Sequence, residues 1–594
     1  MGETWRALQL LAGTSLRTEP WRTTAATILD MVSLLALPVI TIGLKYATDG
    51  LLRHDVTAVA VGVALIAGIT CLARVLESVS GTIRITLAER VGFAFDREVV
   101  TLAAAIPGVE HHERADFQDR LELVRTGQAQ LAGALAELMM LVGEFAGGAG
   151  VVAALAWLDP ALLALILLAV PAIVVASWRE RWRAVGEEGS ATPRRLARHL
   201  RRTLRDRDAG MELRVFGLRD EIRDRMRAAA RDARQANLQA ARRVAVADAG
   251  LQCFLALGYL SGIGYMFWRA VTGHASVGDV VAAVYLCRQV ADLIVAPVFS
   301  AALLGPMLRT ARRLLWLRDY AASAAARRPG DVAPPDRLAA GIVFEDVSFT
   351  YPGTQVPVLR NLSLTVPAGS VVALVGVNGA GKTTLVKLLT RMYEPTSGRV
   401  LVDGVHLADM DVIRWRQRLA AAFQDFARLE LVAQHSVGLG DLPRLDDPDA
   451  TTAALARAGA GDVVVDLPDR LGTQLGSRWD GGVDLSTGQW QKLALGRALM
   501  RDDPLVVFFD EPTASLDAQT EHVLFARYAE VARGGRRSGA VTFLVSHRFS
   551  TVRAADLIVV LDGGEVVEYG DHETLMERAG TYAELFTLQA RSYA

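Results

Sequence analysis

Residues 376–384 read Gly376-Val377-Asn378-Gly379-Ala380-Gly381-Lys382-Thr383-Thr384 and fit the phosphate-binding pattern G-x-x-x-x-G-K-[ST]. An apolar run, Val371 to Val375, precedes them and predicts a buried strand. A helical pattern follows from Thr384 to Leu389. Glycines let the backbone turn tightly and aim N–H groups at phosphate oxygens, and the helix turns its positive end toward the same anion. This strand-loop-helix order predicts a nucleotide-binding site in an α/β domain.

Each group in this loop has an expected role at the phosphates. Lys382 is expected to reach the β- and γ-phosphates, and the Thr383 hydroxyl is expected to hold Mg²⁺. The other residues assigned to the nucleotide are Gly376, Asn378, Gly379, Ala380, Gly381 and Thr384. The predicted ligands are therefore ATP and Mg²⁺. A chance glycine-rich loop is the alternative, and the flanking strand and helix disfavour it.

The composition indicates a membrane protein of several domains. The chain has 594 residues, 51% of them hydrophobic, and its mean hydropathy of +0.26 is too high for an ordinary soluble protein. A net charge of −1 gives no support for a nucleic-acid partner. The three cysteines, Cys71, Cys253 and Cys287, show no disulfide or metal spacing. Abundant arginine and rare lysine favour a bacterial origin, and no signal peptide is expected.

Six apolar segments in the first half are long enough to cross a bilayer, which needs about 20 residues. They lie at residues 24–45, 56–88, 133–157, 160–178, 248–272 and 278–305. Residues 1–22 are expected to form an interfacial helix before them. Arginines concentrate between Arg179 and Arg243, so the positive-inside rule places the long connections and both termini in the cytoplasm. The predicted location is the bacterial inner or plasma membrane.

Two long connections between the spans have helical patterns and are expected to extend the membrane helices into the cytosol. They are residues 89–132 and 179–247. Each is interrupted where a short transverse helix fits, at residues 107–117 and 210–217. The first interruption holds His111 and His112, which are candidates for metal ligands or for a packing contact. Adjacent residues point in different directions on a helix, which favours the contact.

Three charged residues, Arg288, Asp292 and Glu144, fall deep within the predicted spans. At about 1.5 Å per residue, Arg288 lies about 15 Å into its span and Glu144 about 20 Å from the outer end of its own. Charged residues at this depth are expected to face a cavity or each other. Arg288 and Asp292 therefore either line a cargo cavity or form a structural i,i+4 ion pair, and both alternatives stay open.

A linker and a soluble α/β domain follow the membrane segments. Residues 321–340 are rich in Ala, Pro and Arg without an apolar period, which is typical of a linker. The predicted membrane domain, linker and nucleotide-binding domain are residues 1–320, 321–340 and 341–594. Residues 342–349 and 362–366 predict strands at the start of the last domain.

A second buried strand is predicted at Leu505-Val506-Val507-Phe508-Phe509, and it ends in Asp510-Glu511. A carboxylate pair after an apolar strand is the Walker B pattern. Asp510 is placed to hold Mg²⁺ through water, and Glu511 to polarise the attacking water as general base. A solvated pair of charges is the alternative, which the phosphate loop in the same chain disfavours.

The segment Leu485-Ser486-Thr487-Gly488-Gln489 opens a helix rich in Leu, Ala and Arg. It resembles the signature motif of the ATP-binding cassette (ABC) proteins, which usually have glycine where Thr487 stands. The family's other motifs occur in the usual order: an aromatic residue that stacks on adenine, a Q-loop glutamine that touches Mg²⁺, a D-loop aspartate and a switch histidine at the γ-phosphate. The matching residues are Tyr351, Gln424, Asp517 and His547.

Six spans, long cytoplasmic helices and a C-terminal cassette resemble, over nearly the whole chain, an ABC half-transporter of the exporter type. The resemblance implies an α-helical membrane domain followed by an α/β P-loop NTPase domain with a helical subdomain. The resemblance implies that two chains pair and hold nucleotide between the Walker residues of one and the signature of the other. These residues are Lys382, Asp510 and Glu511 on one side, and Ser486, Gly488 and Gln489 on the other. ATP closes the pair and hydrolysis opens it, which gives alternating access across the lipid bilayer.

Thr487 keeps open a heterodimer with one weakened site, although the intact Walker and signature residues favour a homodimer. The predicted function is ATP-driven export of an amphipathic or charged small molecule or a modified peptide. The alternatives are a lipid or drug flippase or exporter, an iron-chelate importer, and an ATP-gated protein that does not transport. An ATPase assay separates the last of these from the others.

Overall fold

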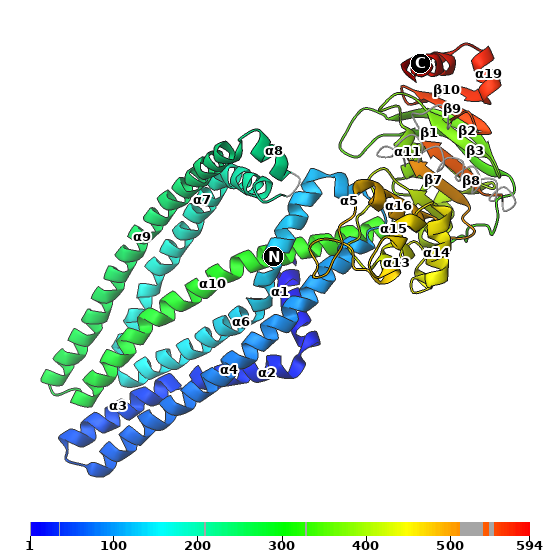
Figure 1. The fold of residues 1–594 in the computed structure, drawn as a ribbon. Helices are drawn as coiled ribbons and strands as arrows, with labels where there is room; N and C mark the ends of the chain where they lie inside the picture. The colour runs from blue at the N-terminus through cyan, green and yellow to red at the C-terminus, as the bar shows by residue number, and fades with distance from the viewer. Residues whose placement is uncertain are drawn as a thin grey trace. The chain divides into compact units, whose positions relative to one another are not determined.

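The structure, a computed structural model, describes residues 2–34, 36–206, 209–326, 330–510, 539–545 and 552–593 (Figure 1). Its contacts divide the chain into two compact units. The first comprises Met1–Thr101 and Arg120–Leu317, and the second comprises Leu102–Asp119 and Arg318–Ala594. The short segment Leu102–Asp119 therefore belongs with the C-terminal part of the chain, although its neighbours in sequence belong to the first unit.

The first unit is built from helices. They are α1 (Gly2–Thr18), α2 (Pro20–Leu34), α3 (Ala36–Leu52), α4 (Val56–Ala105), α6 (Ala115–Leu158), the 3₁₀ helix η1 (Pro160–Leu168), α7 (Ala169–Thr203), α8 (Ala209–Val215), α9 (Arg219–Val271) and α10 (Val277–Ala326). Among the described residues, six helical stretches are long and apolar enough to cross a membrane. This confirms the predicted membrane architecture of six spans. The four-residue helix α5 (Glu110–Glu113) lies in the second unit.

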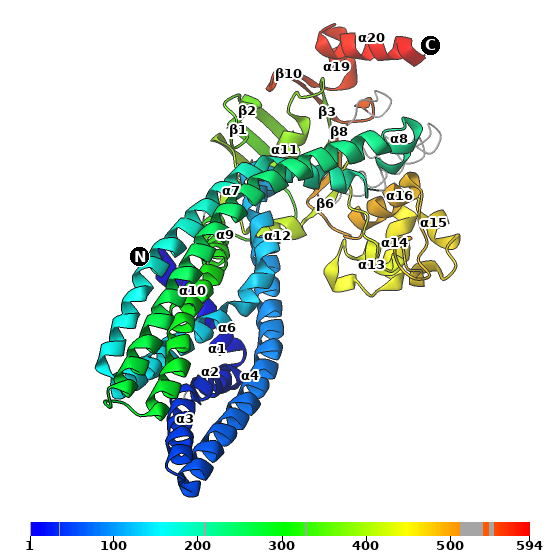
Figure 2. The ribbon, with the colours of Figure 1, turned by 90° about the vertical axis from the view of Figure 1, so that its left-hand side faces the viewer.

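Several helices are much longer than a membrane requires. Helix α4 has 50 residues and α9 has 53. At about 1.5 Å per residue these lengths are about 75–80 Å, against about 30 Å for the hydrocarbon core. Helices α7 and α9 run side by side, with α8 where they meet (Figure 1, Figure 2). Small residues permit this close approach, since a Cβ on Gly186 would lie only 2.9 Å from Cβ of Ala240.

A polar cluster joins the end of α3 to the start of α10. Asp49 accepts hydrogen bonds from Gly278 N and Ser276 Oγ, both at 2.9 Å. Lys45 forms an ion pair with Asp279. No side chain fits at Gly278, because its Cβ would lie 2.4 Å from Asp49 Oδ1. The cluster therefore satisfies free N–H groups at the N-terminus of α10 while it fixes two spans together.

The second unit contains two sheets. The smaller is antiparallel, in the order β2 (Leu359–Pro367), β1 (Gly341–Phe349), β4 (Ser397–Val402), β5 (Val405–His406). The larger has the order β10 (Glu565–Gly570), β9 (Leu557–Asp562), β3 (Val371–Val375), β8 (Val541–Val545), β7 (Val506–Asp510), β6 (Leu419–Ala422). Strand β10 is antiparallel to β9, and the other neighbours in the larger sheet are parallel. The predicted α/β domain is confirmed.

Helices accompany both sheets of the second unit. They are α11 (Lys382–Leu389), α12 (Val412–Gln417), α13 (Ala433–Gly438), α14 (Pro448–Arg457), α15 (Gly461–Val465), α16 (Thr487–Ala498), α19 (His572–Glu577) and α20 (Thr581–Tyr593), with 3₁₀ turns η2 (Leu407–Asp409), η3 (Leu442–Arg444) and η4 (Arg470–Gly472). Helices α13 to α16 contact one another in a helical subdomain. This subdomain was also predicted.

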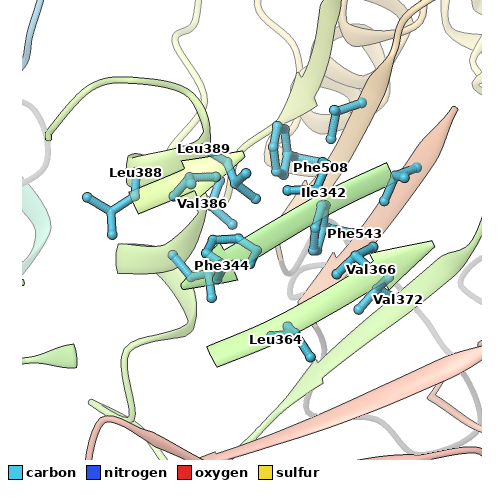
Figure 3. Packing of buried hydrophobic residues seen from close by; sticks show 14 of the residues in the cluster. Ile342, Phe344, Leu364, Val366, Val372, Val386, Leu388, Leu389, Phe508 and Phe543 are labelled. Carbon is cyan, nitrogen blue, oxygen red and sulfur yellow. The ribbon is translucent and has the colours of Figure 1, made fainter. Parts of the chain in front are cut away.

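The inner strands β3, β8 and β7 of the larger sheet are buried at every residue, and they are mostly apolar, as parallel strands usually are. Along β3, the first, third and fifth residues enter a core shared with the helical subdomain. The second and fourth residues enter a second core, shared with the smaller sheet and α11 (Figure 3). In that second core, the rings of Phe508 and Phe543 stack with centroids 5.5 Å apart.

Helix α10 extends into the segment that the sequence assigns to the linker. Residues 321–326 are helical. They comprise five alanines and one serine, and alanine has the highest helix propensity of all residues. Ala321 and Ala324 are buried. Helix propensity and packing therefore outweigh the lack of an apolar period in these six residues.

Candidate functional site

The loop between β3 and α11 has a backbone that requires glycine at two positions. Gly376 has φ +154°, and a Cβ there would lie 2.2 Å from the carbonyl oxygen of Leu561 on β9. Gly381 caps α11 with φ +104°, and a Cβ there would lie 2.5 Å from Leu359 Cδ2. Residues 377–379, between them, are exposed. The loop thus presents its backbone to solvent at the N-terminus of a helix, which is a favourable place for an anion.

Lys382, the first residue of α11, is only 7% exposed. Its Nζ donates hydrogen bonds to Gly376 O at 2.7 Å and to Val377 O at 3.1 Å. These bonds hold the ammonium against the loop backbone. Thr383, the next residue, is exposed, whereas Thr384 is buried. Lys382 and Thr383 therefore lie together at the N-terminus of α11, and their roles at phosphate and Mg²⁺ stay predictions.

The order of the parallel strands brings three predicted groups to one edge of the sheet. Strand β3 leads into the phosphate loop, β7 ends at Asp510, and Gln424 lies shortly after β6. The carboxyl ends of parallel strands lie at the same edge, where ligands of α/β sheets usually bind. Asp510 is 4% exposed, and Gln424 is exposed.

Tyr351, the predicted adenine-stacking residue, follows β1. Its hydroxyl is hydrogen-bonded to Thr384 Oγ1 at 3.0 Å, which ties it to α11. Nζ of Lys387 lies 5.3 Å from the centroid of the Tyr351 ring, within range of a cation–π contact. No sequence motif singled out Lys387. Its place one turn of helix after Thr384 is the only sequence signal that puts it near this ring.

The signature segment begins α16 with a capping box. Ser486 Oγ accepts a hydrogen bond from Gln489 N at 3.2 Å, and Ser486 N donates to Gln489 Oε1 at 2.9 Å. Thr487 is the first helical residue and does not have the positive φ that would require glycine. Its hydroxyl accepts a hydrogen bond from Arg428 Nη2 at 3.3 Å. Threonine is therefore accommodated without strain, and Gly488 follows it within the helix.

The residues of this site suit ATP and Mg²⁺. A loop in which side chains at two glycines would collide, a buried lysine and an aromatic ring match the needs of phosphates and a base. No group of three or more metal-ligating side chains was found among the described residues. Mg²⁺ requires few protein ligands, because phosphates and water complete its octahedron, and the hydroxyl of Thr383 and carboxylate of Asp510 supply the hard oxygens that it prefers.

Comparisons with known proteins agree with this geometry. Residues 359–514 match the family model described as "ABC transporter". The solved structure described as "Structure of a bacterial Atm1-family ABC exporter with ATP bound" matches 97% of this chain and 98% of its own, with a TM-score of 0.76 and 24% sequence identity. Residues 359–514 are thus similar to ABC transporters, and the chain as a whole has the fold of that exporter structure. In the described part of the chain, six helical stretches are long and apolar enough to cross a membrane.

The chain also resembles curated bacterial proteins described as ATP-dependent lipid A-core flippases. The protein from Thiobacillus denitrificans is 37% identical over 264 residues, which are 44% of this chain and 44% of that protein. The protein from Ralstonia nicotianae is 40% identical over 256 residues, 43% of this chain and 42% of that protein. The protein from Alcanivorax borkumensis is 26% identical over 514 residues, 84% of each. The first two matches thus span less than half of the relatives' length.

Some predicted site residues of this chain lie outside the described residues. They are Glu511, Asp517 and His547, and the side chain of Asp292. Their roles stay predictions from the sequence. Ser486, Gly488 and Gln489 have no hydrogen bond to residues 376–384 in the described part of the chain. A single chain therefore does not join its own signature segment to its own phosphate loop through such bonds.

Two of the charged residues predicted inside the membrane can be placed. Glu144 on α6 accepts a hydrogen bond from Ser300 Oγ on α10 at 2.9 Å. Its other carboxylate oxygen is buried and has no hydrogen-bond partner among the described residues. Arg288 on α10 is exposed in the single chain. The ion pair between Arg288 and Asp292 is not tested, because the side chain of Asp292 is not described.

Proposed function

We propose that this half-transporter couples ATP hydrolysis to movement of a substrate across the membrane, by alternating access between two chains. The phosphate loop carries the proposal, because its glycine geometry and buried Lys382 occur in a chain with six apolar spans. Backbone N–H groups and a lysine ammonium together bind polyphosphate. The proposed membrane domain, linker and nucleotide-binding domain are residues 1–320, 321–340 and 341–594.

Mg²⁺ is proposed to bind between the phosphate loop and the end of β7. The exposed hydroxyl of Thr383 and the carboxylate of Asp510 would hold it, with Gln424 as a further oxygen ligand. When bound, Mg²⁺ neutralises charge on the β- and γ-phosphates. The parallel strand order supports this proposal, because it brings all three segments to one edge of the sheet.

The hydrolytic step is assigned to side chains around the γ-phosphate. Lys382 binds the β- and γ-phosphate oxygens and stabilises their charge. Glu511 accepts a proton from water as the water oxygen bonds to phosphorus and the bond to the β–γ bridging oxygen breaks. His547 contacts the γ-phosphate, and Asp517 lies in the D-loop beside it. The assignments of Glu511, His547 and Asp517 rest on their sequence motifs.

Two chains are proposed to complete each ATP site. Ser486 and Gly488 of one chain would meet the γ-phosphate held by the other, at the N-terminus of α16. The ordinary helical backbone at Thr487 supports a working signature segment, and hence a homodimer with two active sites. The distribution of arginines supports an orientation with the cassette and both termini in the cytoplasm.

The proposed cargo is an amphipathic or charged small molecule or a modified peptide. Arg288, Asp292 and Glu144 are proposed to line its cavity, since charged groups inside a membrane usually serve transport. The unpartnered oxygen of Glu144 supports this role. A lipid flippase is the second candidate, because curated relatives are described as lipid A-core flippases.

The proposal is tested by the ATPase activity of the purified full chain in lipid nanodiscs. Wild-type activity is expected to be lost in Glu511→Gln, while ATP binding remains, and both are expected to be lost in Lys382→Ala. Activity without any second protein supports the homodimer. A folded wild-type sample that binds ATP but does not hydrolyse it contradicts the homodimer and directs the search to a partner chain.

The two cargo classes are separated by the same assay. Stimulation of ATPase activity by lipid A-core, compared with stimulation by soluble amphipathic compounds, identifies the preferred class. Arg288→Ala is expected to reduce stimulation by a charged cargo much more than it reduces activity without cargo. Equal loss of both activities assigns Arg288 to the structure of the membrane domain.

A further inference from the structure

The ring of Tyr351 is held by contacts on several sides. Its hydroxyl is hydrogen-bonded to Thr384 on α11, and the ring of Phe349 lies edge-on with centroids 4.9 Å apart. Nζ of Lys387 lies 5.3 Å from the centroid of Tyr351 and 5.8 Å from the centroid of Tyr393. The ammonium of Lys387 is thus shared between two aromatic rings. The position of Lys387 therefore affects the orientation in which the ring of Tyr351 meets a base.

The same ammonium is bound by a carboxylate from α5. Lys387 Nζ lies 2.6 Å from Glu113 Oε1, and the hydroxyl of Tyr393 donates to Glu113 Oε2. Burial would raise the pKa of Glu113, but the hydrogen bonds from Lys387 and Tyr393 and the charge of Lys387 outweigh burial and hold this pKa below its usual range. Glu113 is therefore ionised at neutral pH. It binds both Lys387 and Tyr393, and the ring of Tyr393 lies edge-on to that of Tyr351 with centroids 5.3 Å apart.

Helix α5 is firmly seated within the second unit. His111 is only 2% exposed and packs against Phe117 with ring centroids 5.4 Å apart, while Phe117 packs against Tyr320 at 4.9 Å. Val109 packs against the same hydrophobic core that Tyr351 contacts. A movement of α5 would therefore displace Glu113 relative to Lys387 and Tyr393, because Glu113 is part of that helix.

We propose that Lys387 is a positioning residue for the base-stacking ring of Tyr351, and that α5 controls the position of Lys387 through Glu113. Binding of the base and the packing of α5 against the rest of the second unit, which is the seating of α5, are then energetically coupled. The inference rests on the proposed function in one respect, namely that Tyr351 stacks on adenine. Coupling between two binding events is reciprocal. An intact Glu113–Lys387 pair strengthens binding of the base, and the bound base strengthens the seating of α5 by the same factor.

The test compares a ligand that has a base with one that lacks it. Binding of Mg-ATP and of Mg-tripolyphosphate is measured on the full chain in nanodiscs, in a Glu511→Gln background that prevents hydrolysis. Glu113→Gln and Lys387→Met are expected to weaken ATP binding about fivefold, the change that loss of one partly exposed cation–π contact gives. Binding of tripolyphosphate, which does not touch Tyr351, is expected to stay unchanged.

Two further variants separate positioning from a structural effect. Glu110→Gln changes the same helix, but among the described residues Glu110 forms its ion pair with Arg114 and has no hydrogen bond to Lys387 or Tyr393, so both ligands are expected to bind much as in wild type. Lys387→Arg keeps a cation over the ring and is expected to restore most of the ATP affinity. Amide hydrogen exchange of residues 109–113 is expected to slow more with ATP than with tripolyphosphate, and this difference is expected to vanish in Glu113→Gln.

The outcomes distinguish the inference from the function on which it rests. If Glu113→Gln and Lys387→Met lower the affinity for both ligands equally, or lower neither affinity, the proposed coupling is overturned while ATP binding stands. If wild type binds ATP no more tightly than tripolyphosphate, the stacking role of Tyr351 is overturned, and the inference with it. If wild type binds neither ligand, the proposed ATP site itself fails.

Discussion

The buried ring of His111 makes the stability of the second unit depend on pH. Among the described residues, neither ring nitrogen has a hydrogen-bond partner. Burial, and secondarily the neighbouring ring of His112, lower the pKa of His111 from 6.5 to about 4. The folded pKa is thus below the unfolded pKa. The stabilisation is therefore complete above about pH 6.5 and is lost as the pH falls toward about 4.

The size of the effect follows from this shift. About pH 5 is about 1.5 units below the ordinary pKa of His111, so the unfolded ring is protonated while the folded ring stays mostly neutral. At about 1.4 kcal/mol per unit, the folded state loses about 2 kcal/mol relative to about pH 7.5. For a domain of this size the loss lowers the thermal midpoint by about 4–8 °C.

The assay is thermal unfolding of the full chain in nanodiscs at both pH values, followed by circular dichroism. His111→Phe keeps a ring against Phe117 but cannot be protonated, so its midpoint is expected to fall by about 4–8 °C less than that of wild type. His274→Gln is the matched control, because His274 is exposed in the loop before α10, and it is expected to behave as wild type does. Equal pH dependence in wild type and His111→Phe refutes the reasoning.

Three further predictions concern single sites. Gly376→Ala is expected to abolish ATP binding in calorimetry, because the new Cβ would lie 2.2 Å from Leu561 O and force β3 from β9; tight binding would contradict this. Thr487→Gly is expected to lower the free energy of unfolding by about 0.5–1 kcal/mol without loss of ATPase activity, since the helical backbone there does not need glycine. Higher ATPase activity would show that threonine impairs the site. Asp49→Ala is expected to lower the free energy of unfolding by about 1–3 kcal/mol, because Gly278 N loses its hydrogen-bond acceptor. An unchanged midpoint of thermal unfolding would show that water replaces the carboxylate.

Much of the fold was predictable where a pattern is local. The run at residues 371–375 is β3 with the predicted bounds, because five consecutive apolar residues before a glycine loop suit a strand buried on both faces. The six spans were predictable because each needs about 20 apolar residues in one stretch. The start of a helix at residues 485–489 was likewise predicted, and α16 begins there at Thr487, with Ser486 as its capping residue.

The surroundings of Tyr351 could not be predicted in the same way. Glu113 and Lys387 are 274 residues apart in sequence, so no local period relates them. The rule that adjacent helical residues diverge favoured a packing role for His111 and His112, and His111 does pack against Phe117. Yet the two histidine rings lie only 4.0 Å apart, because in so short a helix the side chains follow the surface on which they are seated.

The two cores of the cassette connect the strand before the phosphate loop to groups on both sides of the larger sheet. Alternate residues of β3 belong to different cores, one shared with α16 and the other with the smaller sheet and α11. The first core positions Ser486, and the second positions Tyr351 and Lys387. Close-packed cores transmit displacement rather than absorbing it. If β3 shifts when ligand binds, we expect one face of the strand to displace the signature segment. We expect its other face to displace the groups that contact α5.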